Sequence, residues 1–201
     1  MTVAVLDYGS GNLRSVEHAL RHVGATVDVT GDPERVRSAS GLVVPGVGHF
    51  GACMAALRER ELDATIKDFI ATGRPVFGVC VGMQILFEGS EEAPGVPGLG
   101  VFEGSVKQLP ETVKVPHMGW DTVVWRDEPL HPYVDDIPVT WFSFAHSYAP
   151  SVTGAVGVTA YGTLISAVVS RENVFATQFH PERSGRWGLK LYAEFVKDAG
   201  P

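Results

Sequence analysis

The sequence predicts an α/β protein with an open, mostly parallel sheet, flanking helices, and an antiparallel strand section in its C-terminal half. Apolar strand-like runs alternate with helical spacing over residues 2–79, which indicates a parallel sheet covered on both faces. Short apolar runs separated by turns, typical of antiparallel strands, follow over residues 95–176. Neither an internal repeat nor a linker interrupts the chain, so we expect one domain over residues 1–201.

The elements of the first half follow from hydrophobic periodicity. Strands are expected where apolar residues run together, and helices where apolar residues recur every three or four positions. Leu13, Val16 and Leu20, for example, share one helical face. The predicted elements are a strand at 2–7, a helix at 12–23, strands at 26–30 and 40–44, a helix at 50–71, a strand at 75–79 and a helix-like segment at 83–87.

The second half contains shorter strands and a final helix. Trp187, Leu191 and Phe195 recur at helical spacing and predict an amphipathic helix over 184–199. The strands before it are expected at 101–106, 123–125, 139–144, 156–161, 166–169 and 174–179. This antiparallel section would bring the end of the last strand back towards residue 80.

The most informative segment is Gly78-Val79-Cys80-Val81-Gly82, which joins an apolar strand to a helix-like segment. A strand that turns abruptly into a helix with Cys80 at its apex predicts a nucleophile elbow. The flanking glycines tolerate a strained turn, and a helix N-terminus favours thiolate over thiol. Most cysteines in apolar runs are structural and buried, so the elbow needs a partner base before it indicates catalysis.

A candidate base stands at the end of the last predicted strand. His180 and Glu182 lie two positions apart there, so both side chains share one face. Pro181 fixes φ between them, and Glu182 can accept a hydrogen bond from one ring nitrogen of His180. The other nitrogen is then free to take a proton from Cys80, giving nucleophile, base and orienting carboxylate.

Four unusual segments are predicted to meet at one edge of the sheet, because ligands of parallel sheets bind beyond the carboxyl ends of the strands. They are 8–12, 45–48, the Cys80 elbow and 180–182. Gly9-Ser10-Gly11-Asn12 is either a tight turn capped by Asn12 or part of the site. A dinucleotide-binding turn is disfavoured, because Arg14 stands where a third glycine is required.

Composition limits the classes of function. A formal net charge of −7 argues against a broad nucleic-acid surface, and 45% hydrophobic residues is ordinary for a globular protein. The first strand begins at Thr2, which indicates neither a signal peptide nor a membrane span. Cys53 and Cys80 form no C-x-x-C motif, so a disulfide framework and a cysteine zinc site are unsupported. We therefore expect a cytoplasmic protein.

Several motifs, in order along nearly the whole chain, resemble the class I, or triad-type, glutamine amidotransferases. Those general to the family are Gly78–Gly82 with Gln84 behind it, Pro45–Gly48 and Phe179–Glu182. Among these enzymes the chain is most similar to the glutaminase subunits of imidazole glycerol phosphate synthase in histidine biosynthesis. That closer similarity is carried by the segments 7–13, 45–51, 116–120 and 144–148, whereas Asp121, Ser143 and Arg183 depart from the expected pattern.

The resemblance implies a flavodoxin-like sheet and a glutaminase that forms a glutamyl thioester on Cys80. It implies His180 and Glu182 as the other catalytic residues and the N–H groups of Gly48 and Val81 as the oxyanion hole. It also implies contacts to glutamine from Gly46, Gln84, Ser147 and Tyr148. A flip of the Val47–Gly48 peptide would then act as a switch, because Gly46 and Gly48 provide backbone freedom.

The implied partner is a cyclase subunit with a (β/α)8 barrel, forming a heterodimer that receives ammonia internally. It would make imidazole glycerol phosphate and an aminoimidazole carboxamide ribotide. The resemblance places Asn12, Trp120 and Arg183 near that contact, although Trp120 could equally be a core aromatic. No cofactor, metal, nucleic acid or membrane is implied. For His117 and His146, hydrogen-bonded structural or interface roles are favoured over metal binding, since no third ligand accompanies them.

Three alternatives stay open at this point. A Cys-His hydrolase of the peptidase or deglycase type would use a similar elbow but needs a glutamate early in the chain near the thiol. A non-catalytic module would have kept the fold and lost the chemistry. The glutaminase of pyridoxal phosphate synthase is the nearest competitor among the amidotransferases, and the segment 116–120 disfavours it.

Overall fold

The computed structural model describes residues 2–126 and 130–200, so residues 1, 127–129 and 201 of the expected domain lie outside the described part. The strands are β1 Thr2–Leu6, β2 Thr26–Thr30, β3 Gly41–Gly46, β4 Val76–Cys80, β5 Phe87–Ser90, β6 Phe102–Gln108, β7 His117–Trp125, β8 Thr140–His146, β9 Tyr148–Ala149, β10 Gly157–Ala160, β11 Leu164–Arg171 and β12 Val174–Thr177. The helices are α1 Leu13–His22, α2 Pro33–Ser38, α3 Phe50–Glu59, α4 Leu62–Ala71, α5 Val81–Gln84, α6 Gly185–Asp198 and the short 3₁₀ helix η1 Pro181–Arg183.

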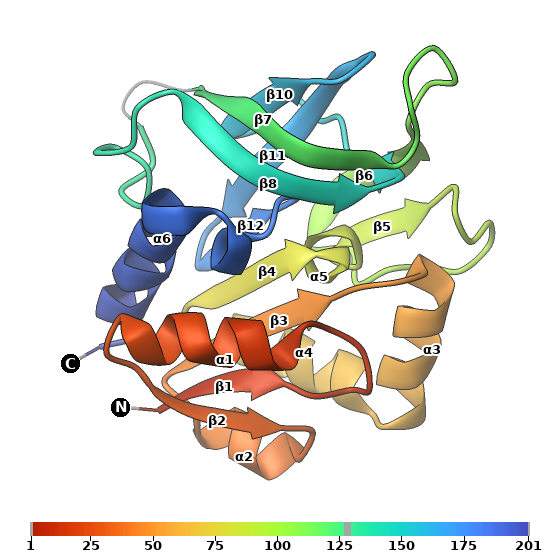
Figure 1. Ribbon diagram of the computed structural model, residues 1–201. Helices are drawn as coiled ribbons and strands as arrows, with labels where there is room; N and C mark the ends of the chain where they lie inside the picture. Colours follow the sequence, from red (N-terminus) through yellow and green to blue (C-terminus); the bar gives the residue numbers. More distant parts are fainter. Residues whose placement is uncertain (1, 127–129, 201) are drawn as a thin grey trace.

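A nine-stranded sheet with the order β2-β1-β3-β4-β12-β11-β10-β7-β8 runs through the molecule (Figure 1). Its first five strands are parallel, and the remaining strands pair antiparallel. A smaller sheet, β5-β6-β9, lies beside it. The predicted fold class, a mostly parallel sheet followed by an antiparallel section, is therefore confirmed.

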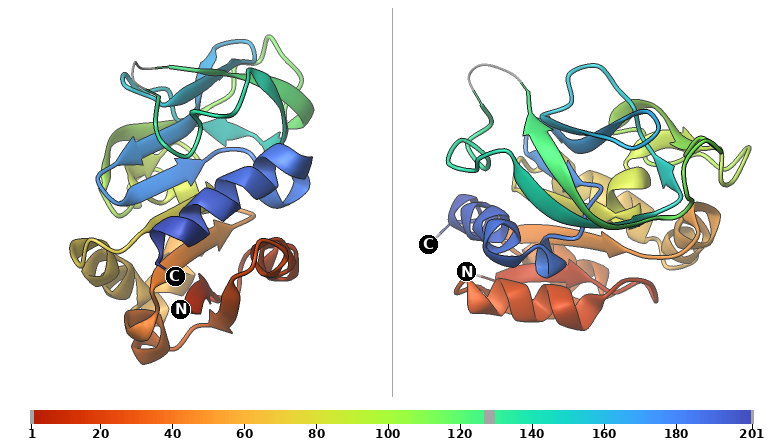
Figure 2. Two further views of the ribbon diagram at one scale, coloured as in Figure 1. Left: turned by 90° about the vertical axis from the view of Figure 1, so that its left-hand side faces the viewer. Right: turned by 45° about the horizontal axis from the view of Figure 1, so that its top comes forward.

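Helices cover both faces of the parallel part, as a parallel sheet requires. In the side view of Figure 2, α1 and α6 lie on one face, and α2, α3 and α4 lie on the other. α1 contacts α6, while α4 contacts both α2 and α3. The strands β1, β3 and β4 are buried nearly throughout, so their sequences are continuously apolar rather than alternating.

Two helical predictions need correction. The helix expected over 50–71 is two helices, because Glu61 adopts a left-handed conformation (φ 55°) between α3 and α4. The helix α2 was not predicted, since it is only six residues long and contains few apolar residues. Local signals for it were present: Pro33 stands at its first turn, and the Asp32 side chain accepts a hydrogen bond from the Glu34 N–H at 2.9 Å.

The helix-like segment 83–87 is also shorter than predicted. α5 ends at Gln84, and β5 begins at Phe87. The carbonyls of Ile85 and Leu86 accept hydrogen bonds from the backbone of residues 99–102, so they are not available to continue a helix. β6, expected to be antiparallel, pairs in parallel with β5 and antiparallel with β9.

An aromatic cluster joins the sheet to α6. Phe77 of β4 has its ring centroid 5.3 Å from Phe175 of β12, 5.2 Å from Tyr192 and 5.6 Å from Phe195. All four side chains are at most 2% exposed. Apolar burial of this extent is a main source of fold stability, and here it fixes α6 against the two strands that lead to residues 80 and 180.

Candidate active site

Cys80 occupies a strained turn between β4 and α5. Its backbone has φ 54° and ψ −111°, a conformation that is uncommon for a residue with a side chain. A Cβ atom at Gly82 would lie 1.9 Å from the Val44 carbonyl oxygen of β3, and one at Gly78 would touch Ala176 of β12. Only glycine at position 82 lets the turn approach β3 this closely. The predicted nucleophile elbow is thus present.

His180 and Glu182 lie just beyond β12, next to the elbow. Oε1 of Glu182 is 2.8 Å from Nδ1 of His180, and the side chains are 0% and 7% exposed, respectively. The backbone of His180 is held on two sides. Its N–H donates to the Ser143 carbonyl of β8 at 2.9 Å, and its carbonyl accepts from Oγ of Ser184, which precedes α6, at 2.6 Å. The ring of His180 is therefore held at both its backbone and its Nδ1 atom.

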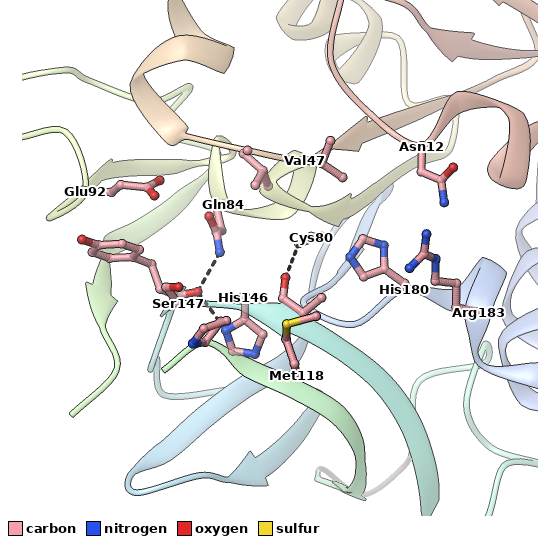
Figure 3. A pocket seen from close by; sticks show the side chains of 15 residues that line it. Asn12, Val47, Cys80, Gln84, Glu92, Met118, His146, Ser147, His180 and Arg183 are labelled. Carbon is pink, nitrogen blue, oxygen red and sulfur yellow. Dashed lines mark hydrogen bonds between the residues drawn. The ribbon is translucent and has the colours of Figure 1, made fainter. Parts of the chain in front are cut away.

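These groups surround a cavity of about 310 Å³, the size of a small-molecule site. Figure 3 shows His180, Arg183 and Asn12 on one side of Cys80, with Gln84, Glu92 and Ser147 on the other. The residues predicted from the sequence that line it are Cys80, His180, Gly48, Val81, Gln84, Ser147, Tyr148, Asn12 and Arg183. The four segments predicted to meet at this edge of the sheet do meet here.

Three predicted residues lie away from the cavity wall. Glu182 lies behind His180, as an orienting carboxylate should. Gly46 packs against the elbow, since a Cβ there would lie 2.5 Å from the Gly82 nitrogen, so a contact to substrate stays a prediction for it. Trp120 is 54% exposed on β7. The core alternative for Trp120 was wrong, because more than half of its side chain is exposed.

The electrostatics of the site favour a charged imidazole. Burial lowers the pKa of His180, but hydrogen bonding and charge from Cys80 and Glu182 outweigh it and leave this pKa well above its ordinary value. The Cys80 sulfur also has polar neighbours, with Gln178 Nε2 at 3.7 Å and the Ala145 carbonyl at 3.9 Å. A thiol beside a cationic imidazole is the arrangement that makes cysteine nucleophilic at neutral pH.

The sequence analysis missed Gln178 and Glu92. Gln178 is a buried polar residue directly after the apolar strand β12 and two positions before His180, and that spacing was the available signal. It also accepts a hydrogen bond from Gln84 Nε2 at 3.0 Å, which links Gln84 to Cys80. Glu92 lines the cavity, and its Oε2 accepts from the Phe50 N–H at 2.7 Å. No local pattern singled out Glu92.

A pair of buried histidines supports the cavity wall. His146 Nε2 is 3.3 Å from His117 Nδ1, and His146 Nδ1 is 3.0 Å from the Tyr148 carbonyl. Because a carbonyl only accepts, we assign the proton of His146 to Nδ1. That carbonyl also accepts from Gln84 Nε2 at 2.8 Å. Among the described residues no group of three or more His, Cys, Asp or Glu side chains is arranged to bind a metal, and the hydrogen bonds support a structural role for both histidines.

The buried His146 is expected to make the protein less stable at acid pH. Burial and the neighbouring His117 lower its pKa to about 3, whereas in the unfolded chain it takes up a proton near pH 6.5. The unfolded state therefore binds more protons between these values, so stability is complete above pH 6.5 and falls as the pH drops. At about pH 5 the loss amounts to roughly 2 kcal/mol. The free energy of unfolding, measured in urea, should depend less on pH in His146→Gln than in the wild type. The exposed control His18→Gln should show the wild-type dependence. Equal slopes for the wild type and both variants would contradict this role of His146.

The arrangement is suited to acyl transfer through a covalent thioester. It offers a thiol at an elbow, a buried imidazole beside it and a carboxylate that fixes the imidazole. Gly48 and Val81, whose N–H groups are the predicted oxyanion hole, line the same cavity. Gly48 has φ 93°, a conformation that favours glycine. In the part of the chain that the structure describes, no helix is long and apolar enough to cross a membrane.

The sequence is similar to known proteins over nearly its whole length. Residues 4–199 match the family described as glutamine amidotransferase class-I. Imidazole glycerol phosphate synthase subunit HisH of Acinetobacter baylyi is 45% identical, covering 97% of each chain. The protein of the same name from Thermococcus kodakarensis is 46% identical, covering 96% of this chain and 98% of its own.

Solved structures share the fold at low sequence identity. One titled "Crystal structure of glutamine amidotransferase" superimposes with a TM-score of 0.74 at 22% identity, covering 99% of each chain. A structure of PurLQS from Thermotoga maritima gives a TM-score of 0.77 at 20% identity, covering 98% of this chain and 97% of its own. These likenesses concern the fold alone.

Proposed function

Because this chain belongs to the class I glutamine amidotransferases, and among them to the HisH subunits of imidazole glycerol phosphate synthase, we propose that it hydrolyses glutamine to glutamate and ammonia for histidine biosynthesis. The observation that carries the mechanism is that Cys80 and His180 line one cavity, with Glu182 hydrogen-bonded to His180 from behind. The full-length relatives favour this function over the hydrolase, the inactive module and the pyridoxal phosphate synthase glutaminase.

The first half-reaction forms a thioester. The Cys80 thiolate attacks the side-chain amide carbon of glutamine, and the carbonyl oxygen becomes an oxyanion facing the N–H groups of Val81 and Gly48. His180, which holds the proton taken from Cys80, gives it to the amide nitrogen. The carbon–nitrogen bond then breaks, and ammonia leaves.

The second half-reaction restores the enzyme. His180 takes a proton from water, and the resulting hydroxide equivalent attacks the thioester carbon. The carbon–sulfur bond breaks, glutamate leaves, and His180 returns the proton to Cys80 if the thiol is reformed. Glu182 stays ionised throughout and offsets the positive charge that appears on His180 in each half.

The cavity offers polar groups for the other end of glutamine. We place its α-ammonium group near the carboxylate of Glu92, which points into the cavity. Ser147 and Tyr148 line the same side, and Gln84 holds the Tyr148 carbonyl at 2.8 Å. Gln84 thus supports the binding wall through the backbone as well as lining the cavity.

The proposed partner is a cyclase subunit, and the resemblance implies a (β/α)8 barrel and a heterodimer. Asn12 and Arg183 line the cavity, and Trp120 is exposed on the nearby strand β7, so all three are available for contact. The Nδ2 atom of Asn12 is buried without a hydrogen-bond partner among the described residues. A cytoplasmic location belongs to this proposal, because Cys80 must remain a reduced thiol to act.

The proposed gate lies in the segment after β3. Ser10 Oγ donates to the Val47 carbonyl at 2.6 Å, which holds the Val47–Gly48 peptide in one orientation. Since the loss of one oxyanion donor costs about 3 kcal/mol in the transition state, a flip of this peptide would switch the glutaminase. Such a flip would need to break the Ser10 contact.

We expect partner and ligand together to stimulate glutamate release about ten- to a hundredfold. The measurement compares this chain alone, with the cyclase subunit, and with the cyclase subunit plus its nucleotide substrate. Equal release under all three conditions would contradict the gate and leave an ungated glutaminase. An absence of release under every condition would overturn the function itself.

A further inference from the structure

Glu182 has one carboxylate oxygen without a partner. Its side chain is 0% exposed, and Oε1 contacts His180 Nδ1 at 2.8 Å. Oε2 is buried and has no hydrogen-bond partner among the described residues. A buried carboxylate normally accepts hydrogen bonds on both oxygens, because its charge is costly to remove from water. A donor is therefore expected near Oε2.

A second unpartnered group is the hydroxyl of Tyr192. This side chain of α6 is 0% exposed, and its oxygen has no hydrogen-bond partner within the described part of the chain. Burial raises the pKa of Tyr192 well above its ordinary value, and the negative charge of Glu182 raises it further. The phenol thus stays protonated, and the carboxylate of Glu182 is its polar neighbour.

The helix α6 is held in the position that brings these groups together. A Cβ atom at Gly188 would lie 1.9 Å from the Pro181 carbonyl, so this turn of α6 packs directly on η1. Tyr192 stands four residues later on the same helical face. Its ring is fixed by Phe77, with centroids 5.2 Å apart. Backbone and ring therefore leave the hydroxyl little freedom to find another partner.

We propose that Tyr192 is a positioning residue of the catalytic triad, whose hydroxyl donates to Oε2 of Glu182 and fixes the carboxylate that orients His180. This inference rests on the proposed glutaminase function and adds Tyr192 to the residues that support its catalytic triad. Tyr192 does not line the cavity and does not touch the substrate. Its effect passes through Glu182 to His180, whose positive charge in each half-reaction needs a fixed counter-ion.

Tyr192→Phe removes only the hydroxyl and keeps the packed ring. We expect kcat for glutamine hydrolysis in the complex with the cyclase to fall about five- to twentyfold at unchanged KM. The pH profile of the rate should also change, because the donor that holds the carboxylate in place against His180 has been removed. Tyr133→Phe is the matched control, since Tyr133 donates its hydroxyl to Asp198 at 2.7 Å away from the triad, and its kcat and profile should match the wild type.

A double-mutant cycle separates positioning from a general effect. If Tyr192 acts through Glu182, Tyr192→Phe should have no further effect on kcat in a Glu182→Gln background. An equal loss in both backgrounds would overturn the proposal, as would a single variant with wild-type kcat and pH profile.

A second readout does not depend on glutamine turnover. The rate at which iodoacetamide alkylates Cys80, followed by peptide mass, reports the thiolate as a function of pH. Its acid limb should move with Tyr192→Phe and stay in place with Tyr133→Phe. A profile that does not move would overturn the positioning role, whereas absent glutaminase activity with a shifted alkylation profile would overturn only the proposed reaction.

Discussion

Replacing Cys80 with alanine is expected to abolish glutamate release, lowering kcat/KM by at least about ten-thousandfold. The variant cannot form the thioester, and no other thiol lines the cavity in the described structure. Because the Cys80 side chain is small and 3% exposed, alanine should fit without disturbing the elbow. Release is measured with the cyclase and its nucleotide substrate present, so that any gate is open.

Cys53→Ala is the control for this substitution. Cys53 is the other free cysteine, 2% exposed in α3, and we interpret it as a core residue. This variant should keep its activity to within about threefold. Residual turnover by Cys80→Ala above about one per cent of wild type would show that the reaction does not pass through a thioester on this residue.

His180→Gln is expected to lower kcat/KM by about a thousandfold or more. Glutamine fills similar space and can still hydrogen-bond, but it can neither hold the Cys80 proton nor deliver it to the leaving nitrogen. Cys80 should also be alkylated more slowly at acid pH. The raised pKa of His180 keeps a cationic imidazole beside the sulfur in the wild type, and glutamine supplies no such charge. Exposed His22→Gln on α1 is the matched control and should leave both rates unchanged.

The two catalytic substitutions should not be additive. Once Cys80 is absent, His180 has no thiol to activate, so the double variant should be no slower than Cys80→Ala alone. A further loss on adding His180→Gln would mean that the histidine acts on a different group. Circular dichroism of each variant confirms that the comparison is between folded proteins.

The parallel part of the fold could be predicted because its strands are buried on both faces and are punctuated by glycine. β2 has the predicted bounds, and β1 and β4 differ from them by a residue at one or both ends. The separation of α3 from α4 at Glu61 could not be predicted. Apolar spacing continues across it, and only tertiary packing stabilises a left-handed residue there. The end of α5 could not be predicted either, because the carbonyls that would continue the helix accept hydrogen bonds from residues 99–102, which are distant in the sequence.

For the site, the sequence was informative where chemistry and backbone strain coincide. Cys80 between glycines and His180 two residues before Glu182 are local patterns, and the structure brings all three together. Glu92 and Tyr192 belong to no such pattern, because their positions relative to the triad depend on how β5 and α6 pack. The side on which Trp120 lies was likewise open until the register of β7 against β8 was known.

The most direct test of the central claim is to treat the complex with a diazoketone analogue of glutamine and locate the adduct by peptide mass. The ketone carbon of this analogue stands where the substrate has its amide carbon, and the diazomethyl carbon stands where the substrate has its amide nitrogen. The catalytic thiol should therefore bond to the diazomethyl carbon, with loss of dinitrogen. We predict a single adduct per chain, on Cys80, with parallel loss of glutamate release and protection by glutamine. An adduct on Cys53 or elsewhere, or full inactivation with Cys80 unmodified, would contradict the account.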